Sequence, residues 1–215
     1  MKIYITRHSK TLWNQEKRLQ GWQDSPLSET GIKDALLLKD RIKDLKIDCC
    51  YSSPIGRAKS TSQILFDHFN EDVRLKEMNF GIYEGKKIAE LLNNEEYFNL
   101  WNHPDDNVRL TGGESYFEVQ TRLKSFINDV YQKYHDKTIF ITIHGMLFVI
   151  LHGLMLNYQT KDLVKINQHI VRGCSLSEVD FDGKNFTIKY IGDASHLDDE
   201  EVISCLLYTS DAADE

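Results

Sequence analysis

The chain has 215 residues, enough to bury a sizeable core in a single α/β domain, and its 41% hydrophobic and 27% charged residues are ordinary for a globular protein. Its formal charge of −7 argues against the broad basic face that binds nucleic acid. The longest apolar stretch, Met146 to Met155, is too short to span a bilayer, and with no signal-peptide pattern before the first predicted strand we expect a cytoplasmic protein.

The chain begins with an alternating run, Lys2 to Thr6, which predicts a strand that ends in a polar turn at Arg7 and His8. Open α/β sheets bind ligands at the carboxyl ends of their strands, so this turn is a candidate site. A guanidinium beside an imidazole suits an oxyanion, because Arg binds phosphate through a bidentate fork and a neutral His can attack as a nucleophile. Alone, however, the dipeptide is more often simply a polar strand exit.

The next elements follow from periodicity and turn signals. Leu12 to Asp24 shows neither period and predicts an ordered loop. A helix is expected from about Ser28, a natural N-cap, to Leu45. Much of its buried stripe is predicted to consist of Ile32, Leu36, Ile42 and Leu45. A short strand, Ile47 to Ser52, ends in a polar turn, and another helix is predicted through about Phe69.

Arg57 lies in the first turn of that helix, where a cation opposes the helix macrodipole. Helix stability therefore does not explain it. Its guanidinium and nearby backbone N–H groups could bind the same anion as Arg7 and His8. A solvated surface arginine is an equally good interpretation from position alone.

Val73 to Leu75 is a short strand candidate, followed by a loop with two glycines, Gly81 and Gly85, whose backbone can approach a ligand. Within this loop Glu77 could act as an acid or base, and Glu84 could be structural. Most carboxylates in loops are merely solvated.

The second half of the chain predicts further alternation of helices and strands. Helices are expected over about Ile88 to Trp101 and Ser115 to Tyr134, separated by a loop. The β-branched run Thr138 to Ile143 is typical of a strand buried on both faces, and it ends at His144 before an apolar helix. Ser175 to Phe181 and Asn185 to Tyr190 predict a hairpin. We therefore predict a three-layer α/β/α sandwich with a mostly parallel sheet and helices on both faces.

Together, these corners resemble the histidine phosphatase superfamily, the phosphoglycerate-mutase-like enzymes, most nearly its broad-specificity phosphatases. Arg7-His8-Ser9-Lys10-Thr11 and Trp13-Asn14 are similar to the family's opening signature, Arg-His-Gly-Glu-Thr followed by Trp-Asn. The family's later motifs are matched, in the same order, by four further segments of this chain. These are Ser52-Ser53-Pro54-Ile55-Gly56-Arg57-Ala58, Leu75 to Gly85, Gly112-Gly113-Glu114-Ser115 and the strand ending in His144-Gly145. The resemblance runs from residue 2 to about Leu197.

This resemblance implies a phosphomonoesterase that uses a phosphohistidine on His8. Arg7, Arg57 and His144 would form the phosphate pocket, and Asn14 would add a neutral donor. Glu77 would protonate the leaving oxygen and then activate water. The scheme implies no metal and no cofactor, in keeping with four cysteines that lack zinc-site spacing, and its partner would be a small phosphorylated metabolite.

Three positions depart from the family pattern. Ser9 replaces a glycine, Lys10 stands where an acid or amide is usual, and Met146 replaces a common glycine. None of these removes a catalytic group, but efficiency and substrate choice stay open. The remaining histidines are more simply surface or packing residues. Trp22, Trp101 and Tyr116 could shape a substrate wall, although aromatic residues more often belong to the core.

Two alternatives compete with a hydrolase. A phosphoglycerate mutase would share the phosphohistidine, but such mutases usually carry a longer basic insertion after the acid motif. Here 36 residues separate Glu77 from Glu114, and their charged side chains are largely acidic. A catalytically silent binding protein of this fold is supported only by Ser9 and Lys10. The sequence does not choose between a monomer and a homodimer.

The last eleven residues, Cys205 to Glu215, continue none of the preceding pattern and match the translation of a sequencing-adaptor end. We therefore predict a single domain over residues 1–204 and a non-native tail over 205–215. An ordinary disordered C-terminus is the alternative.

Overall fold

The computed structural model describes residues 1–167 and 170–198, in which six strands form one mixed sheet of order β3-β2-β4-β1-β5-β6. The strands are β1 (Lys2–Arg7), β2 (Cys49–Ser52), β3 (Asn70–Glu71), β4 (Thr138–Ile143), β5 (Leu176–Phe181) and β6 (Phe186–Asp193). The first four are parallel, and β5 pairs antiparallel with both β1 and β6. The predicted mostly parallel sheet is confirmed.

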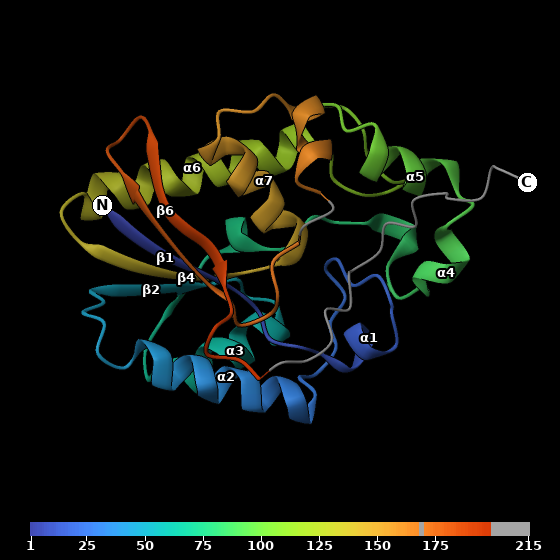
Figure 1. The fold of residues 1–215 in the computed structure, drawn as a ribbon. Coiled ribbons are helices and arrows are strands. Elements are labelled where there is room, and N and C mark those ends of the chain that lie inside the picture. Colours follow the sequence, from blue (N-terminus) through green and yellow to red (C-terminus); the bar gives the residue numbers. More distant parts are fainter. Residues whose placement is uncertain (168–169, 199–215) are drawn as a thin grey trace, which may run out of the picture.

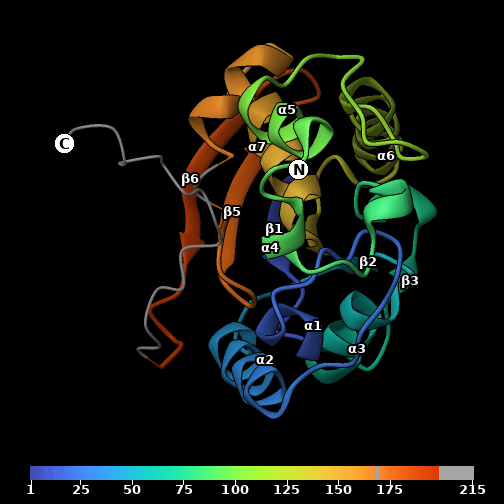
Figure 2. The same ribbon diagram turned by 90° about the vertical axis from the view of Figure 1, so that its right-hand side faces the viewer.

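Helices cover both faces of this sheet. They are α1 (Leu12–Gln15), α2 (Glu29–Ile42), α3 (Gly56–Leu65), α4 (Ile88–Leu91), α5 (Glu95–Asn102), α6 (Tyr116–Tyr134) and α7 (Gly145–Met155), with 3₁₀ helices at Val73–Leu75, Gly81–Tyr83 and Thr160–Lys165. Figures 1 and 2 show α2 and α3 on one face and α6 and α7 on the other. The three-layer sandwich is therefore as predicted.

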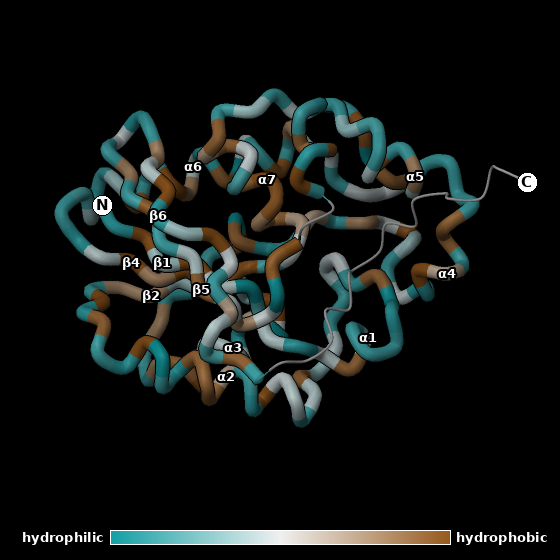
Figure 3. Tube along the Cα trace, in the orientation of Figure 1, coloured by the Kyte–Doolittle hydropathy of each residue, from teal (hydrophilic) through white to brown (hydrophobic). Residues whose placement is uncertain are grey.

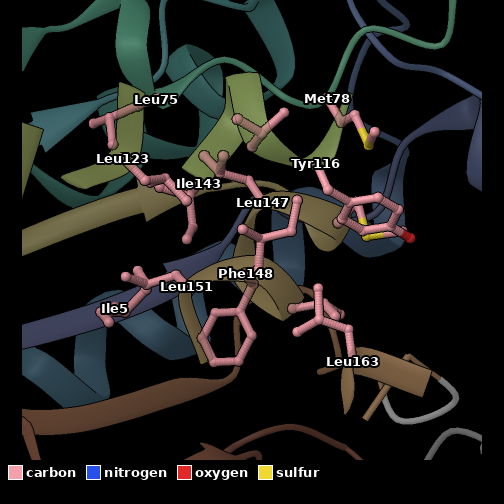
Figure 4. Close-up of a cluster of buried hydrophobic side chains, with 14 of the residues drawn as sticks. Ile5, Leu75, Met78, Tyr116, Leu123, Ile143, Leu147, Phe148, Leu151 and Leu163 are labelled. Atoms are coloured by element: carbon pink, nitrogen blue, oxygen red, sulfur yellow. The ribbon is translucent and has the colours of Figure 1, made fainter. Parts of the chain in front are cut away.

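The central strands divide the core between the two faces. Ile3 and Ile5 of β1 belong to the cluster beneath α6 and α7, whereas Tyr4 packs into the smaller cluster beneath α2 and α3. This alternation follows from the two-residue side-chain period of a strand. Hydrophobic colour follows β4 and α7 in Figure 3, and Figure 4 shows Leu147 and Leu151 of α7 among the side chains of the larger cluster.

The buried face of α2 differs from the prediction. Ser28 does cap the helix, but Ile32 and Leu36 are 44% and 53% exposed. The buried apolar residues are Ala35, Leu38 and Ile42 instead. Apolar residues on this helix form two adjacent stripes at helical spacing, and only packing against the sheet decides which one is buried.

Several shorter elements also differ from the sequence-based prediction. The predicted loop after β1 contains α1, whose four residues are too few to show a helical period. Val73–Leu75 is a 3₁₀ helix capped by Asp72, and the edge strand lies upstream at Asn70–Glu71. Helix α3 ends at Leu65 rather than at about Phe69, because Phe66 is already extended.

The single helix predicted over about Ile88 to Trp101 is two helices. Asn94 adopts an extended conformation, and its side chain accepts a hydrogen bond from the N–H of Tyr97, which starts α5. The division into α4 and α5 therefore comes from an N-cap inside the apolar pattern.

The predicted tail at 205–215 lies outside the described residues. In the described part of the chain, no helix has the length and apolar character needed to cross a membrane.

Candidate active site

His8 and His144 lie side by side because β1 and β4 are adjacent, parallel and in register. Arg7 is paired with Ile143 at the ends of the two strands. The residue that follows each strand is a histidine, so both histidines lie at the same edge of the sheet. The N–H of His8 donates to the carbonyl of Ile143 at 2.8 Å, and the two imidazole centroids are 5.2 Å apart. Two motifs 136 residues apart thus form one corner.

The His8 ring is held in a defined orientation. It is 3% exposed, and its Nδ1 lies 2.7 Å from the backbone carbonyl of Ser9. A carbonyl oxygen only accepts hydrogen bonds, so Nδ1 carries the proton in the neutral ring and Nε2 keeps its lone pair. Burial, followed by the nearby charges of Arg57 and Arg7, holds the pKa of His8 well below its usual value of 6.5. The ring is therefore neutral and its Nε2 can attack an electrophile.

Arg57 is fully buried beside this nitrogen. Its Nε donates to His8 Nε2 at 3.3 Å, while its terminal nitrogens donate to the carbonyls of Gly21 and Gln23 at 2.7 and 2.8 Å. Asp24 accepts from the Arg57 backbone N–H at 3.1 Å. Burial lowers the pKa of Arg57, although Glu77 and Asp24 oppose that effect. The surface interpretation of Arg57 is therefore wrong.

Arg7 and His144 bring further polar groups to the same corner. Arg7 donates from one terminal nitrogen to the carbonyl of Val171 at 3.0 Å, but its buried Nε has no partner among the described residues. Neither ring nitrogen of the fully buried His144 has one either. Such groups are normally satisfied, so an anion that accepts from Arg7 Nε and from the protonated ring nitrogen of His144 would remove an energetic cost.

His144 is held as a neutral imidazole. Burial, then the charge of Arg57, holds the pKa of His144 well below 6.5, with His8 and Arg7 acting in the same direction. A phosphoryl dianion beside the ring would act in the opposite direction, because an opposite charge favours the protonated form.

Glu77 is buried, 6% exposed, and its carboxylate faces the start of α7. Its Oε1 accepts from the N–H groups of Met78 and Leu147, both at 2.9 Å, and its Oε2 accepts from Met146 at 3.1 Å. The positive end of a helix and three N–H donors therefore fix this carboxylate in the wall of the cavity that also contains His8. It is not one of the solvated loop carboxylates.

Asn14 lies in the same cavity wall. Its Oδ1 accepts from the N–H and hydroxyl of Thr11, both at 3.0 Å, and its own N–H donates to Thr11 Oγ1. This capping box of α1 uses the amide oxygen, so the Nδ2 donors are the part of Asn14 that can serve a ligand.

Glu84 connects two segments that the sequence did not associate. Its carboxylate accepts from the N–H groups of Trp22, Gln23 and Phe80 at 2.8–2.9 Å. Gly21, at φ +56°, lies so close that an added Cβ would be 2.0 Å from Glu84 Oε1. Glu84 thereby ties the segment that holds Arg57 to the loop that holds Glu77.

Arg122 and Trp22 fix the loop of Glu77 from outside. Arg122 donates to the carbonyls of Arg74, Lys76 and Glu77 at 2.6–3.0 Å and pairs with the Glu114 carboxylate at 2.9 Å. Trp22 Nε1 donates to the same Glu77 carbonyl at 2.7 Å. Long-range contacts of this kind leave no local sequence signal, which is why neither role was predicted.

Beyond the polar corner, the cavity wall is largely apolar. The cavity has a volume of about 90 Å³. Its apolar and aromatic lining consists of Leu19, Phe80, Ile88, Tyr97, Trp101, Met146 and Ile170. Of the three aromatic residues that could shape a wall, Trp101 lines the cavity, whereas Tyr116 is in the core and Trp22 supports the Glu77 loop. Arg18 and Asn167 also line the cavity and were not predicted.

Comparison with known proteins identifies the family of the chain. Residues 3–194 match the family described as histidine phosphatase superfamily (branch 1). The chain belongs to this superfamily. It is 30% identical over 213 residues to a Yersinia pestis protein named "Probable phosphoglycerate mutase GpmB", covering 92% of this chain and 95% of the other.

Solved structures give the same result. Bacillus stearothermophilus YhfR superposes with a TM-score of 0.83 at 30% identity, covering 91% of this chain and 98% of that chain. A phosphoglycerate mutase from Bacillus anthracis gives 0.75 at 26% identity, covering 92% and 95%. This histidine phosphatase is accordingly a phosphatase or mutase type of enzyme.

The structure accommodates two departures from the family pattern. Ser9 has no left-handed backbone, its hydroxyl donates to the carbonyl of Gly31 at 2.6 Å, and its N–H donates to Thr61 Oγ1. Met146 contacts Glu77 through its backbone N–H, which does not depend on the side chain.

Within the described residues, no three His, Cys, Asp or Glu side chains are grouped to hold a metal ion. The expected lack of a metal requirement stays a prediction.

Proposed function

We propose that this histidine phosphatase hydrolyses small phosphomonoesters through a phosphohistidine on His8, without a metal. The observation that carries the proposal is the convergence of four groups on one cavity. His8 Nε2 lies 3.3 Å from Arg57 Nε, and Arg7 and Glu77 line the same walls. A nucleophile, cations for the phosphoryl oxygens and a carboxyl for the leaving oxygen are what such a transfer requires.

In the first step, the lone pair of His8 Nε2 forms a bond to phosphorus while the bond from phosphorus to the ester oxygen breaks. Glu77 gives its proton to that oxygen, so the product leaves as a neutral alcohol. Arg7, Arg57, His144 and Asn14 donate hydrogen bonds to the phosphoryl oxygens as charge moves across them.

In the second step, water attacks the phosphorus of phosphohistidine, and the phosphorus–nitrogen bond breaks. The Glu77 carboxylate accepts a proton from the attacking water, which restores the acid for the next cycle. His8 Nδ1, held by the Ser9 carbonyl, keeps its proton throughout, and this spares the ring a change of tautomer.

Hydrolysis is favoured over mutase chemistry by the character of the cavity. A mutase must also hold a bisphosphorylated intermediate, whose second phosphate needs cations of its own. The wall beyond His8 is instead mostly apolar, and its additional arginine, Arg18, is engaged by Glu16 at 2.5 Å and by the Gly85 carbonyl at 2.8 Å. The names of the Yersinia pestis and Bacillus anthracis relatives keep a phosphoglycerate mutase as the second candidate.

The test uses the chain ended at Ser204, its His8→Ala variant and, as a matched control, His68→Ala, which removes an exposed histidine. Phosphate release is measured in EDTA from a panel that includes p-nitrophenyl phosphate and 3-phosphoglycerate. Isomerisation of 3-phosphoglycerate is followed in parallel. We expect release by the parent and the control but not by His8→Ala. Isomerisation faster than release would establish the mutase, and neither reaction would indicate a binding protein.

A further inference from the structure

Two residues of the cavity wall each carry a buried polar atom that has no function in the proposed phosphoryl transfer. These atoms are Nε1 of Trp101 and Oδ1 of Asn167, and neither has a hydrogen-bond partner among the described residues. Asn167 is only 2% exposed, and both residues line the cavity that contains His8. One atom is a donor and the other an acceptor.

The orientation of the Asn167 amide is set by the protein. Its Nδ2 donates to the backbone carbonyl of Trp101 at 2.9 Å. A carbonyl cannot donate, so exchanging the amide nitrogen and oxygen would place two acceptors against each other. Oδ1 is therefore the atom left without a partner, and it belongs to the residue that contacts Trp101.

An unpaired buried donor or acceptor costs about 1–3 kcal/mol, and proteins normally avoid this cost unless a ligand removes it. A hydroxyl suits both kinds of atom, because its hydrogen can donate to an acceptor such as Asn167 Oδ1 and its oxygen can accept from a donor such as Trp101 Nε1. A carboxylate has no hydrogen to donate and would bring negative charge toward the lone pairs of Oδ1.

The surroundings of this pair also argue for an uncharged group. Phe80, Ile88 and Tyr97 supply apolar or aromatic surface to the same cavity. The additional arginine in the lining, Arg18, already has a carboxylate and a carbonyl as partners. A substrate part that lies here gains by burying apolar surface and loses by burying charge.

We propose that Trp101 and Asn167 select a leaving group that is uncharged, largely apolar and carries a hydroxyl. This inference rests on the proposed phosphatase function and names the substrate class of that site. The site then discriminates as hydrogen-bonding pockets do: an analogue that lacks the polar group leaves the protein atoms buried and unpaired.

The experiment compares 2-arylethyl phosphates, which share an alkyl leaving oxygen and differ only on the ring. The ring carries a hydroxyl, an isosteric methyl group or a carboxylate, each in the para and meta positions. kcat/KM is measured for the chain, for Asn167→Leu, for Trp101→Phe and for the control Asn128→Leu, which changes an exposed residue of α6.

We expect the better hydroxyl isomer to exceed its methyl analogue by at least about tenfold in kcat/KM, with the carboxylate poorest. The ratio should fall toward one in Asn167→Leu and in Trp101→Phe, and stay unchanged in Asn128→Leu. Two variants are used because either alone could disturb folding. A ratio near one in the unmodified chain, a ratio that survives both substitutions, or a preference for the carboxylate would overturn the proposal.

Failure of the proposed function gives a different result. If no phosphate is released even from p-nitrophenyl phosphate, hydrolysis is wrong, and the dissociation constants of the same esters are measured with the His8→Ala variant. A preference of at least about tenfold for the hydroxyl ester in binding would still support the subsite. Equal binding of hydroxyl and methyl esters would refute it.

Discussion

Replacement of Glu77 by Gln tests the acid directly, because the amide keeps the shape of the side chain but has no proton to give to a leaving oxygen. The structure predicts two separable losses. The first loss lowers kcat/KM for every substrate. The single amide oxygen cannot accept from all three N–H groups, those of Met78, Met146 and Leu147, that the carboxylate accepts from. One donor is then left facing an NH₂ group, at a cost of about 1–3 kcal/mol.

The second loss depends on the leaving group. An alkyl alkoxide needs a proton as it departs, whereas p-nitrophenolate leaves without one. General acid catalysis contributes about 10²- to 10⁴-fold, so Glu77→Gln should reduce kcat/KM on an alkyl monoester by at least about 10² more than on p-nitrophenyl phosphate. Dividing one loss by the other removes the structural part that both substrates share.

The assay is steady-state phosphate release from 2-phenylethyl phosphate and p-nitrophenyl phosphate, with circular dichroism to confirm folding. Glu90→Gln, which alters an exposed carboxylate of α4, is the matched control and should change neither rate. Equal losses on the two substrates would mean that Glu77 only supports the site, and the acid would have to be sought elsewhere.

Two further predictions concern the supporting groups and the buried histidines. Glu84→Ala removes the carboxylate that accepts hydrogen bonds from the backbone N–H groups of Trp22, Gln23 and Phe80. KM should therefore rise by about tenfold or more, and equally for alkyl and nitrophenyl esters, whereas Glu77→Gln affects the alkyl ester more. The control Glu90→Ala, which changes an exposed residue, should leave KM unchanged. His8 and His144 are held neutral, with pKa values well below 6.5, so the unfolded chain binds more protons below that pH. Their contribution to stability is complete above pH 6.5 and falls with acidification, by up to about 1.4 kcal/mol per pH unit for each histidine. Urea unfolding between pH 7.5 and 5.5 should show a smaller decline in His8→Ala than in the parent; an identical decline would contradict this account.

The sequence by itself predicted the architecture of the sheet and named the candidate site residues. A strand buried on both faces has a continuous apolar run, and β4 coincides with the predicted Thr138–Ile143. Polar residues at the carboxyl ends of parallel strands meet at one edge of the sheet, as Arg7, His8 and His144 do. The resemblance to the family's motifs is what grouped these three residues from the sequence.

Short elements were less predictable because their signals are local and weak. Helix α1 has four residues and is defined by a capping box rather than by a period. Asn94 divides an apolar pattern that otherwise suits one helix. On α2, Ile32 and Leu36 form a plausible stripe, and only the position of the sheet places Leu38 inside instead. In each case a tertiary or capping contact outweighs the average preference of the segment.

The tertiary structure alone decided how the candidate site is held and what lines the cavity beyond the polar corner. Glu84 acts through backbone N–H groups about 60 residues away in the chain, and every residue has such groups, so the sequence carries no mark of this contact. The same holds for Asn167, whose amide is fixed by the Trp101 carbonyl. Motifs encode the chemistry because only certain side chains can perform it, whereas selectivity arises from packing, which brings ordinary residues together and leaves particular atoms unpaired.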